Sequence, residues 1–151
     1  AYPVRVPPDP EWYFYKTSKG TLMSRVGVLQ GTYLGIYLSN TCHFWYSRPA
    51  PTNCGFCTTG KNVGMNEERT KNIDDVVEVC QIAKEKSGVT FVHFNTGYHQ
   101  LGKELDLIAP FVKAVKEAVG LLIGVQATPT EHLWKYDWLR DMGTDHFSFC
   151  Y

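Results

Sequence analysis

Three cysteines lie close together in the segment SNTCHFWYSRPAPTNCGFCTTG, which spans residues 39–60. Eleven residues separate Cys42 from Cys54, and two residues separate Cys54 from Cys57. A Cys-x-x-Cys pair in a glycine-containing turn can direct two thiolates at one metal centre. With a third thiolate, one iron of a 4Fe-4S cluster stays open to another ligand. The spacing therefore predicts a metal site held by Cys42, Cys54 and Cys57.

A zinc site is the alternative interpretation of the same residues. Cys42, Cys54 and Cys57, with His43 as a fourth ligand, could form the tetrahedral set of a zinc-stabilised binding or structural module. Short Cys-x-x-Cys pairs often bind zinc, so the spacing alone does not choose the metal. The odd total of 5 cysteines favours a metal site over a disulfide framework.

Apolar strands and amphipathic helices alternate along the rest of the chain. The pattern predicts strands over 32–38, 89–95 and 121–126, and a fourth from about residue 145. Helices are expected over 72–86, over 102–119 with a kink or break at Pro110, and from a cap at Thr130 to Gly143. This alternation implies right-handed crossovers and a parallel sheet. We therefore predict an α/β fold, a partial β/α barrel of about four βα units.

The residues before this barrel, 1–31, are expected to form a separate N-terminal part. A proline-rich extended arm reaches residue 11, and a hairpin with its turn at Ser18-Lys19-Gly20 follows over 12–30. Residues 32–151 would then be the N-terminal half of the barrel. Because the chain starts with Ala1 and ends within a predicted strand, we expect a fragment of a longer protein.

The position of the cysteines after the first strand, together with Cys54-Gly55-Phe56-Cys57, resembles the radical S-adenosylmethionine (SAM) superfamily. The usual family motif, C-x3-C-x-φ-C, has an aromatic residue at φ, which is Phe56 here. The resemblance covers roughly residues 32–151, and the eleven-residue spacer departs from the motif. Lengthening a flexible loop by this amount costs only about 1 kcal/mol, so the spacer is tolerable.

The resemblance implies a 4Fe-4S cluster whose open iron binds the amino and carboxylate groups of SAM. Electron transfer from the cluster, supplied by a donor such as flavodoxin or ferredoxin, would cleave SAM to methionine and a 5′-deoxyadenosyl radical. The substrate, a small molecule or a macromolecule, is left open because later strands of the family choose it.

Five residues are implied as cofactor-binding by the same resemblance. Phe56 would lie beside the adenine, and Asn95, Thr96 and Gly97 match the turn that receives the methionine amino group. Gln126, at the end of the third strand, would contact the ribose or the carboxylate. A plain turn chosen for its φ angles is the alternative for residues 95–97, and a structural hydrogen bond is the alternative for Gln126. The other cysteines, Cys80 and Cys150, are expected in the core.

Composition and charge exclude some classes of protein. Lys plus Arg and Asp plus Glu both number 15, so no net charge favours binding to nucleic acid or to an anionic membrane. No apolar run approaches the roughly 20 residues of a membrane span, and the first residues lack the pattern of a signal peptide. We therefore expect a cytoplasmic protein with one hydrophobic core, consistent with its 44% hydrophobic residues.

Overall fold

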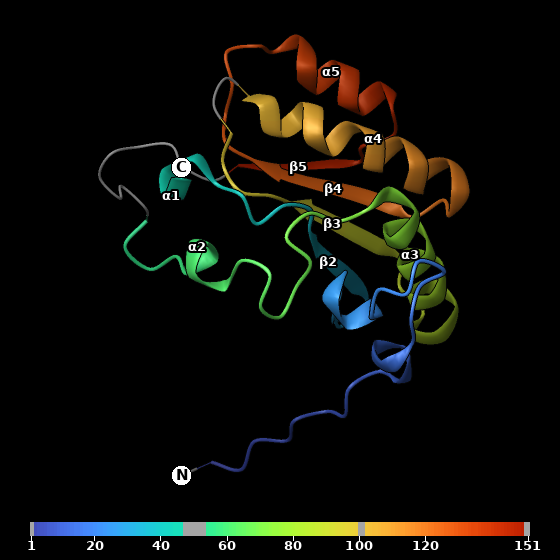
Figure 1. Cartoon of the computed structure of the whole chain (residues 1–151). Coiled ribbons are helices and arrows are strands. Elements are labelled where there is room, and N and C mark those ends of the chain that lie inside the picture. The colour runs from blue at the N-terminus through green and yellow to red at the C-terminus, as the bar shows by residue number, and fades with distance from the viewer. Residues whose placement is uncertain (1, 47–53, 100–101, 150–151) are drawn as a thin grey trace.

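The computed structural model describes residues 2–46, 54–99 and 102–149, and it has an α/β fold (Figure 1). Five strands form one sheet in the order β1-β2-β3-β4-β5. β1 pairs antiparallel with β2, and the other pairs are parallel, which confirms the predicted parallel sheet. The strands are β1 (Val28–Gln30), β2 (Tyr33–Tyr37), β3 (Phe91–Asn95), β4 (Leu122–Ala127) and β5 (His146–Phe149).

Three helices connect the parallel strands and pack side by side along one face of the sheet (Figure 1). They are α3 (Ile73–Ser87), α4 (Lys103–Ala118) and α5 (Trp134–Asp141). The Asn72 side chain caps α3 by accepting a hydrogen bond of 3.0 Å from the main-chain N–H of Asp74. α4 continues through Pro110, so of the predicted kink or break at this proline the break does not occur. No helix of the described residues is long and apolar enough to cross a membrane.

The start of α5 differs from the prediction. Thr130 does not cap this helix, because its hydroxyl oxygen accepts from the main-chain N–H of His132 at 3.3 Å and forms a separate turn. The helix begins at Trp134, which is 59% exposed. The local turn at Thr130 thus replaces the first predicted helical turn, and only part of the apolar face of α5 reaches the core.

The predicted hairpin over residues 12–30 is wrong in its strands. The segment holds two 3-10 helices, η1 (Glu11–Phe14) and η2 (Met23–Arg25), with a single antiparallel bridge between Lys16 and Leu22. Trp12 and Met23 are buried in the core. Because these side chains pack there, the segment forms 3-10 helices instead of two strands paired by hydrogen bonds. The observed hairpin is β1–β2, which turns at Gly31 with a φ of 64°. The expected boundary at residue 31 therefore falls inside a hairpin.

Two short helices lie in the connection between β2 and α3 (Figure 1). They are α1 (His43–Tyr46) and α2 (Thr59–Asn62), and the three clustered cysteines lie beside them in the chain. Because this connection leaves the carboxyl end of β2, it occupies the edge where parallel sheets build their sites.

Candidate functional site

The cysteine loop, residues 39–71, runs from the end of β2 to the start of α3. Cys42 and Cys57 are half-buried, and Cys54 is exposed. The main-chain N–H of Cys57 donates to the carbonyl of Cys54 at 3.1 Å, so these two cysteines share one tight turn. Among the described residues, no three His, Cys, Asp or Glu side chains converge into a preformed metal site. Residues 47–53 of the spacer lie outside the described residues.

The aromatic residues of the spacer attach α1 to both of its neighbours. Phe44 stacks on Tyr98, which follows β3, with ring centroids 4.7 Å apart. On the other side, Trp45 covers Gly60 of α2 so closely that a Cβ at position 60 would lie 2.2 Å from Trp45 Cδ2. α1 is therefore held between the loop that follows β3 and α2. The contact of Trp45 with Gly60 joins the part of the chain near Cys42 to the part near Cys57.

The sulfur of Cys57 receives hydrogen bonds from its surroundings. The main-chain N–H of Thr59 lies 3.5 Å from Cys57 Sγ. Burial disfavours the thiolate, but hydrogen bonds from Thr59 and from the Trp45 side chain outweigh it and lower the pKa of Cys57. Since the thiolate is the form that binds metals, the chemistry of this donor set fits a thiolate-ligated metal or cluster.

Tyr37, the last residue of β2, is a neighbour of the cysteines that the sequence analysis missed. Burial raises the pKa of Tyr37 to about 12, and the negative charges of Cys42, Cys57 and Glu67 add to this effect, while a hydrogen bond with Thr59 opposes it. The phenol is therefore neutral at physiological pH. Tyr37 could have been found from the sequence, because it lies near the end of the first predicted strand and alternates with the apolar residues that face the core.

Gly97 packs directly against the chain at Cys42. Its main-chain N–H donates to the carbonyl of Ser39 at 3.0 Å. A Cβ at position 97 would lie 2.0 Å from Thr41 O and 2.9 Å from the Cβ of Cys42. Its φ is not in the left-handed region, so the position requires glycine for close approach rather than for φ freedom. Thr96 adds a hydrogen bond of 3.2 Å from its hydroxyl to the carbonyl of Ser39.

Asn95 and Gln126 meet on the sheet face that the helices leave open. The Asn95 side-chain amide donates to Gln126 Oε1 at 2.8 Å, and Asn95 Oδ1 accepts from the main-chain N–H of Thr96 at 2.7 Å. The structural hydrogen bond considered for Gln126 is thus present. Both side chains line a cavity of about 450 Å³, together with Arg25, Tyr37 and His93.

Phe56 is not brought to this cavity. Its side chain is 92% exposed, and it is not one of the residues that line the cavity. The structure thus places Asn95 and Gln126 together, sets Gly97 against Cys42, and leaves Phe56 exposed outside the cavity lining.

His43, the fourth ligand of the zinc interpretation, lies against His99 with ring centroids 5.3 Å apart. Burial, together with the charge of His43, lowers the pKa of His99. Two buried polar atoms nearby in the chain, Nε2 of His99 and Oε2 of Glu104, have no hydrogen-bond partner among the described residues.

The predicted core cysteine, Cys80, is fully buried, and this burial raises the pKa of its thiol. Cys150, the other cysteine expected in the core, lies outside the described residues.

A scan against protein-family models finds no match for the chain, and a search of curated proteins finds no significant similarity.

Proposed function

We propose that this chain is part of a radical SAM enzyme in which Cys42, Cys54 and Cys57 hold a 4Fe-4S cluster. The observation that supports this most is the loop of three thiols at the carboxyl end of the first parallel strand, with N–H donors directed at Cys57. When bound, the cluster and SAM supply a 5′-deoxyadenosyl radical, with an electron from a donor such as flavodoxin or ferredoxin.

The chain's own residues have separate roles in this proposal. The close contact of Gly97 with Thr41 fixes the position of Cys42 relative to the carboxyl ends of the strands. Asn95 and Gln126 offer hydrogen bonds to a polar ligand in the cavity, with Gln126 near its ribose or carboxylate. Main-chain groups of Thr96 and Gly97 would receive the amino group. We also propose that further strands pair with the edge strand β5 and extend the sheet into a barrel around the cavity.

Anaerobic reconstitution of the chain with iron and sulfide tests the metal assignment. We expect a brown protein with broad absorption near about 400 nm. Cys42→Ala, Cys54→Ala and Cys57→Ala should each abolish cluster assembly, because removing one of three ligands leaves the cluster without enough protein thiolates. Cys80→Ala is the matched control, since Cys80 is buried in the core, and it should keep its iron. A colourless protein that holds one zinc tightly would favour the zinc-stabilised module instead.

SAM affinity of the reconstituted protein tests the cofactor-binding residues. Gln126→Ala should weaken SAM binding by about fivefold to tenfold, the loss of roughly one hydrogen bond, while iron content stays unchanged. Unchanged affinity in this variant would place the cofactor elsewhere and leave only the cysteine assignment.

A further inference from the structure

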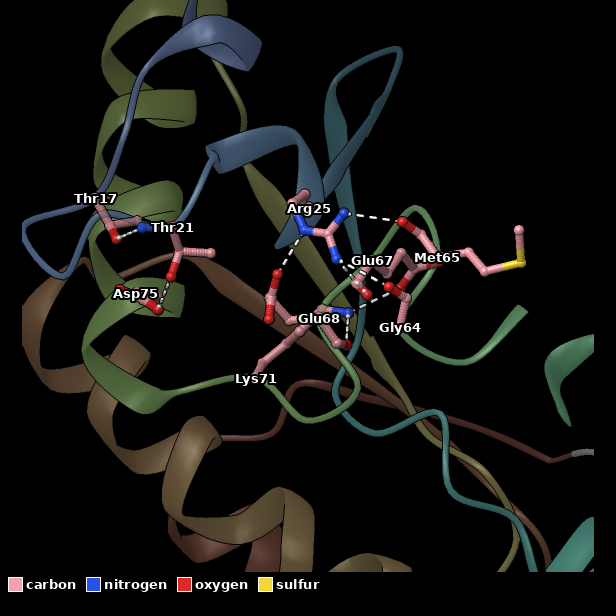
Figure 2. Close-up of polar contacts among 9 residues, drawn as sticks. All are labelled: Thr17, Thr21, Arg25, Gly64, Met65, Glu67, Glu68, Lys71 and Asp75. Carbon is pink, nitrogen blue, oxygen red and sulfur yellow. Dashed lines mark hydrogen bonds and ion pairs between the residues drawn. The ribbon is translucent and has the colours of Figure 1, made fainter. Parts of the chain in front are cut away.

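The part of the cysteine loop that returns toward α3, residues 64–68, is wrapped around the guanidinium of Arg25 (Figure 2). We call these five residues the return limb. The Nη1 of Arg25 donates to Met65 O at 2.9 Å, and its Nη2 donates to Gly64 O at 3.2 Å and to Glu67 O at 3.1 Å. The Nε forms an ion pair with Glu68. In return, the main-chain N–H of Glu68 donates to the carbonyl of Arg25 at 3.2 Å.

Arg25 itself belongs to a firmly held segment. Its neighbours Met23 and Val26 are buried in the core. On the side away from the return limb, the hydroxyl of Thr21 donates to Asp75 Oδ2 of α3 at 2.9 Å, which Figure 2 shows to the left of Arg25. The N-terminal segment therefore joins two parts of the protein: it contacts α3 through Ser18, Lys19 and Thr21, and the cysteine loop through Arg25.

The return limb forms one wall of the candidate site. Glu67 lines the same cavity as Arg25 and Tyr37. A buried ammonium, that of Lys71, donates to Glu67 Oε2 at 2.8 Å and to Glu68 O at 2.9 Å, so the limb is held from two sides. α2, which follows Cys57, ends two residues before the limb begins. A change in the path of the limb would thus move both Glu67 and the Cys57 turn.

We propose that Arg25 is a positioning residue for the cysteine loop, because its guanidinium sets the path of the return limb. Through the limb it places Glu67 and the Cys57 turn relative to Tyr37. What the loop binds rests on the proposed function, whereas the positioning of the limb does not.

An arginine is required here because its planar fork presents five N–H groups in fixed directions. Three carbonyls and one carboxylate surround it in this structure. A lysine at position 25 could keep the pairing with Glu68 but could not reach all three carbonyls. Arg25→Lys should therefore show an effect between the parent and Arg25→Met.

Native-state hydrogen exchange of the metal-free chain tests the proposal. In Arg25→Met, we expect the protected amides of Met65 and Glu68 to exchange at least about tenfold faster, which equals about 1.4 kcal/mol of opening free energy. Amides of α3 should not change. The matched control is Thr21→Val, which removes one contact of the same segment with α3, the hydrogen bond to Asp75. It should speed exchange of the Asp74 and Val76 amides, which donate to Asn72, and leave the return limb unchanged.

This crossed pattern separates positioning from general stability, because a loss of global stability would speed exchange in both regions. Equal acceleration in the limb and in α3, or no acceleration in the limb, would overturn the proposal. In reconstituted protein, Arg25→Met should also lower iron content or alter the electron paramagnetic resonance signal, with Arg25→Lys intermediate; parent-like clusters in both variants would overturn it too. If even the parent assembles no cluster, the proposed function fails, and hydrogen exchange alone then decides the role of Arg25.

Discussion

The two faces of the sheet are built from alternate residues of the same strands, yet they differ in chemistry. The face under the helices is apolar and fully buried, with Leu34, Ile36, Val92, Phe94, Ile123 and Val125. The open face carries the cavity and is largely polar, with Tyr37, His93, Asn95, Gln126 and Ser148. Because successive side chains point to opposite faces, a strand can supply stability on one side and chemistry on the other.

Size also alternates across the open face. His93 lies between Gly35 on β2 and Gly124 on β4 in the strand register. The missing side chain at Gly124 lets the His93 ring pass over β4, and its Nε2 lies 3.3 Å from the hydroxyl of Ser148 on β5. A glycine beside a large polar residue thus allows side chains to hydrogen-bond across an intervening strand. On the face under the helices, by contrast, apolar side chains of similar size fill the space between the sheet and the helices.

The largest difference between the faces should appear at the neighbouring residues Phe94 and Asn95. Phe94 is fully buried and lies near Phe111, with ring centroids 6.4 Å apart. Phe94→Ala should therefore lower the free energy of unfolding by about 3–5 kcal/mol, the usual cost of emptying a buried aromatic site. Urea unfolding measures this loss. A cost as small as that of Asn95→Ala would mean that the two faces do not divide stability in this way.

Local patterns in the sequence predicted the four parallel strands and the bounds of α3 and α4 to within about two residues. Those elements are defined by apolar periodicity and by caps such as Asn72, which depend only on neighbouring residues. The cysteines, Asn95 and Gln126 were found because each follows or ends a strand. In α/β folds with a parallel sheet, a polar residue at the carboxyl end of a strand is a candidate for a binding site.

Contacts between distant segments could not be read in the same way. Arg25 and Met65 are 40 residues apart, and nothing near either residue indicates their hydrogen bond. The N-terminal segment was misread as a hairpin because Trp12 and Met23 are apolar residues in a strand-like pattern, although they are used for core packing. The exposed Phe56 shows a different limit: its place in a sequence motif does not indicate which residues its side chain contacts.

The glycine on the open face gives the next largest effect. A Cβ at Gly124 would lie 2.4 Å from Phe91 Cζ and 2.9 Å from His93 Cδ2. Gly124→Val should therefore destabilise the protein by about 1–3 kcal/mol, the typical cost of overpacking. Gly55→Ala is the control, because no atom of the described residues lies within 4 Å of its Cβ position, and it should stay within about 0.5 kcal/mol of the parent. Equal stability of both variants would show that the open face is not closely packed.

A smaller effect is expected from the polar pair on the open face. Asn95→Ala removes the hydrogen bond of 2.8 Å to Gln126 and the one of 2.7 Å from the main-chain N–H of Thr96, and it should cost about 1–2 kcal/mol, since both partners are only half-buried and water can solvate them. A double-mutant cycle with Gln126→Ala should give a coupling energy of about 0.5–1 kcal/mol. Zero coupling would mean that the two side chains contribute independently.

The smallest expected effect is the pH dependence that His93 adds to stability. Burial, with the charge of His146 on β5, lowers the pKa of His93, so the folded state binds its proton less readily than the unfolded chain does. The stabilising contribution is therefore complete above the ordinary histidine pKa of about 6.5 and is lost as the pH falls from there toward the lowered folded-state value. Because the side chain is only half-buried and in part solvated, this loss should be smaller than the effects of the variants above. His93→Gln keeps a polar side chain but cannot titrate, so its free energy of unfolding should fall less than that of the parent between about pH 7 and 5.

His132→Gln is the control, because this exposed histidine does not lie on the sheet, and its profile should follow the parent. A parent profile matched by His93→Gln would show that the open face holds His93 without resisting its protonation.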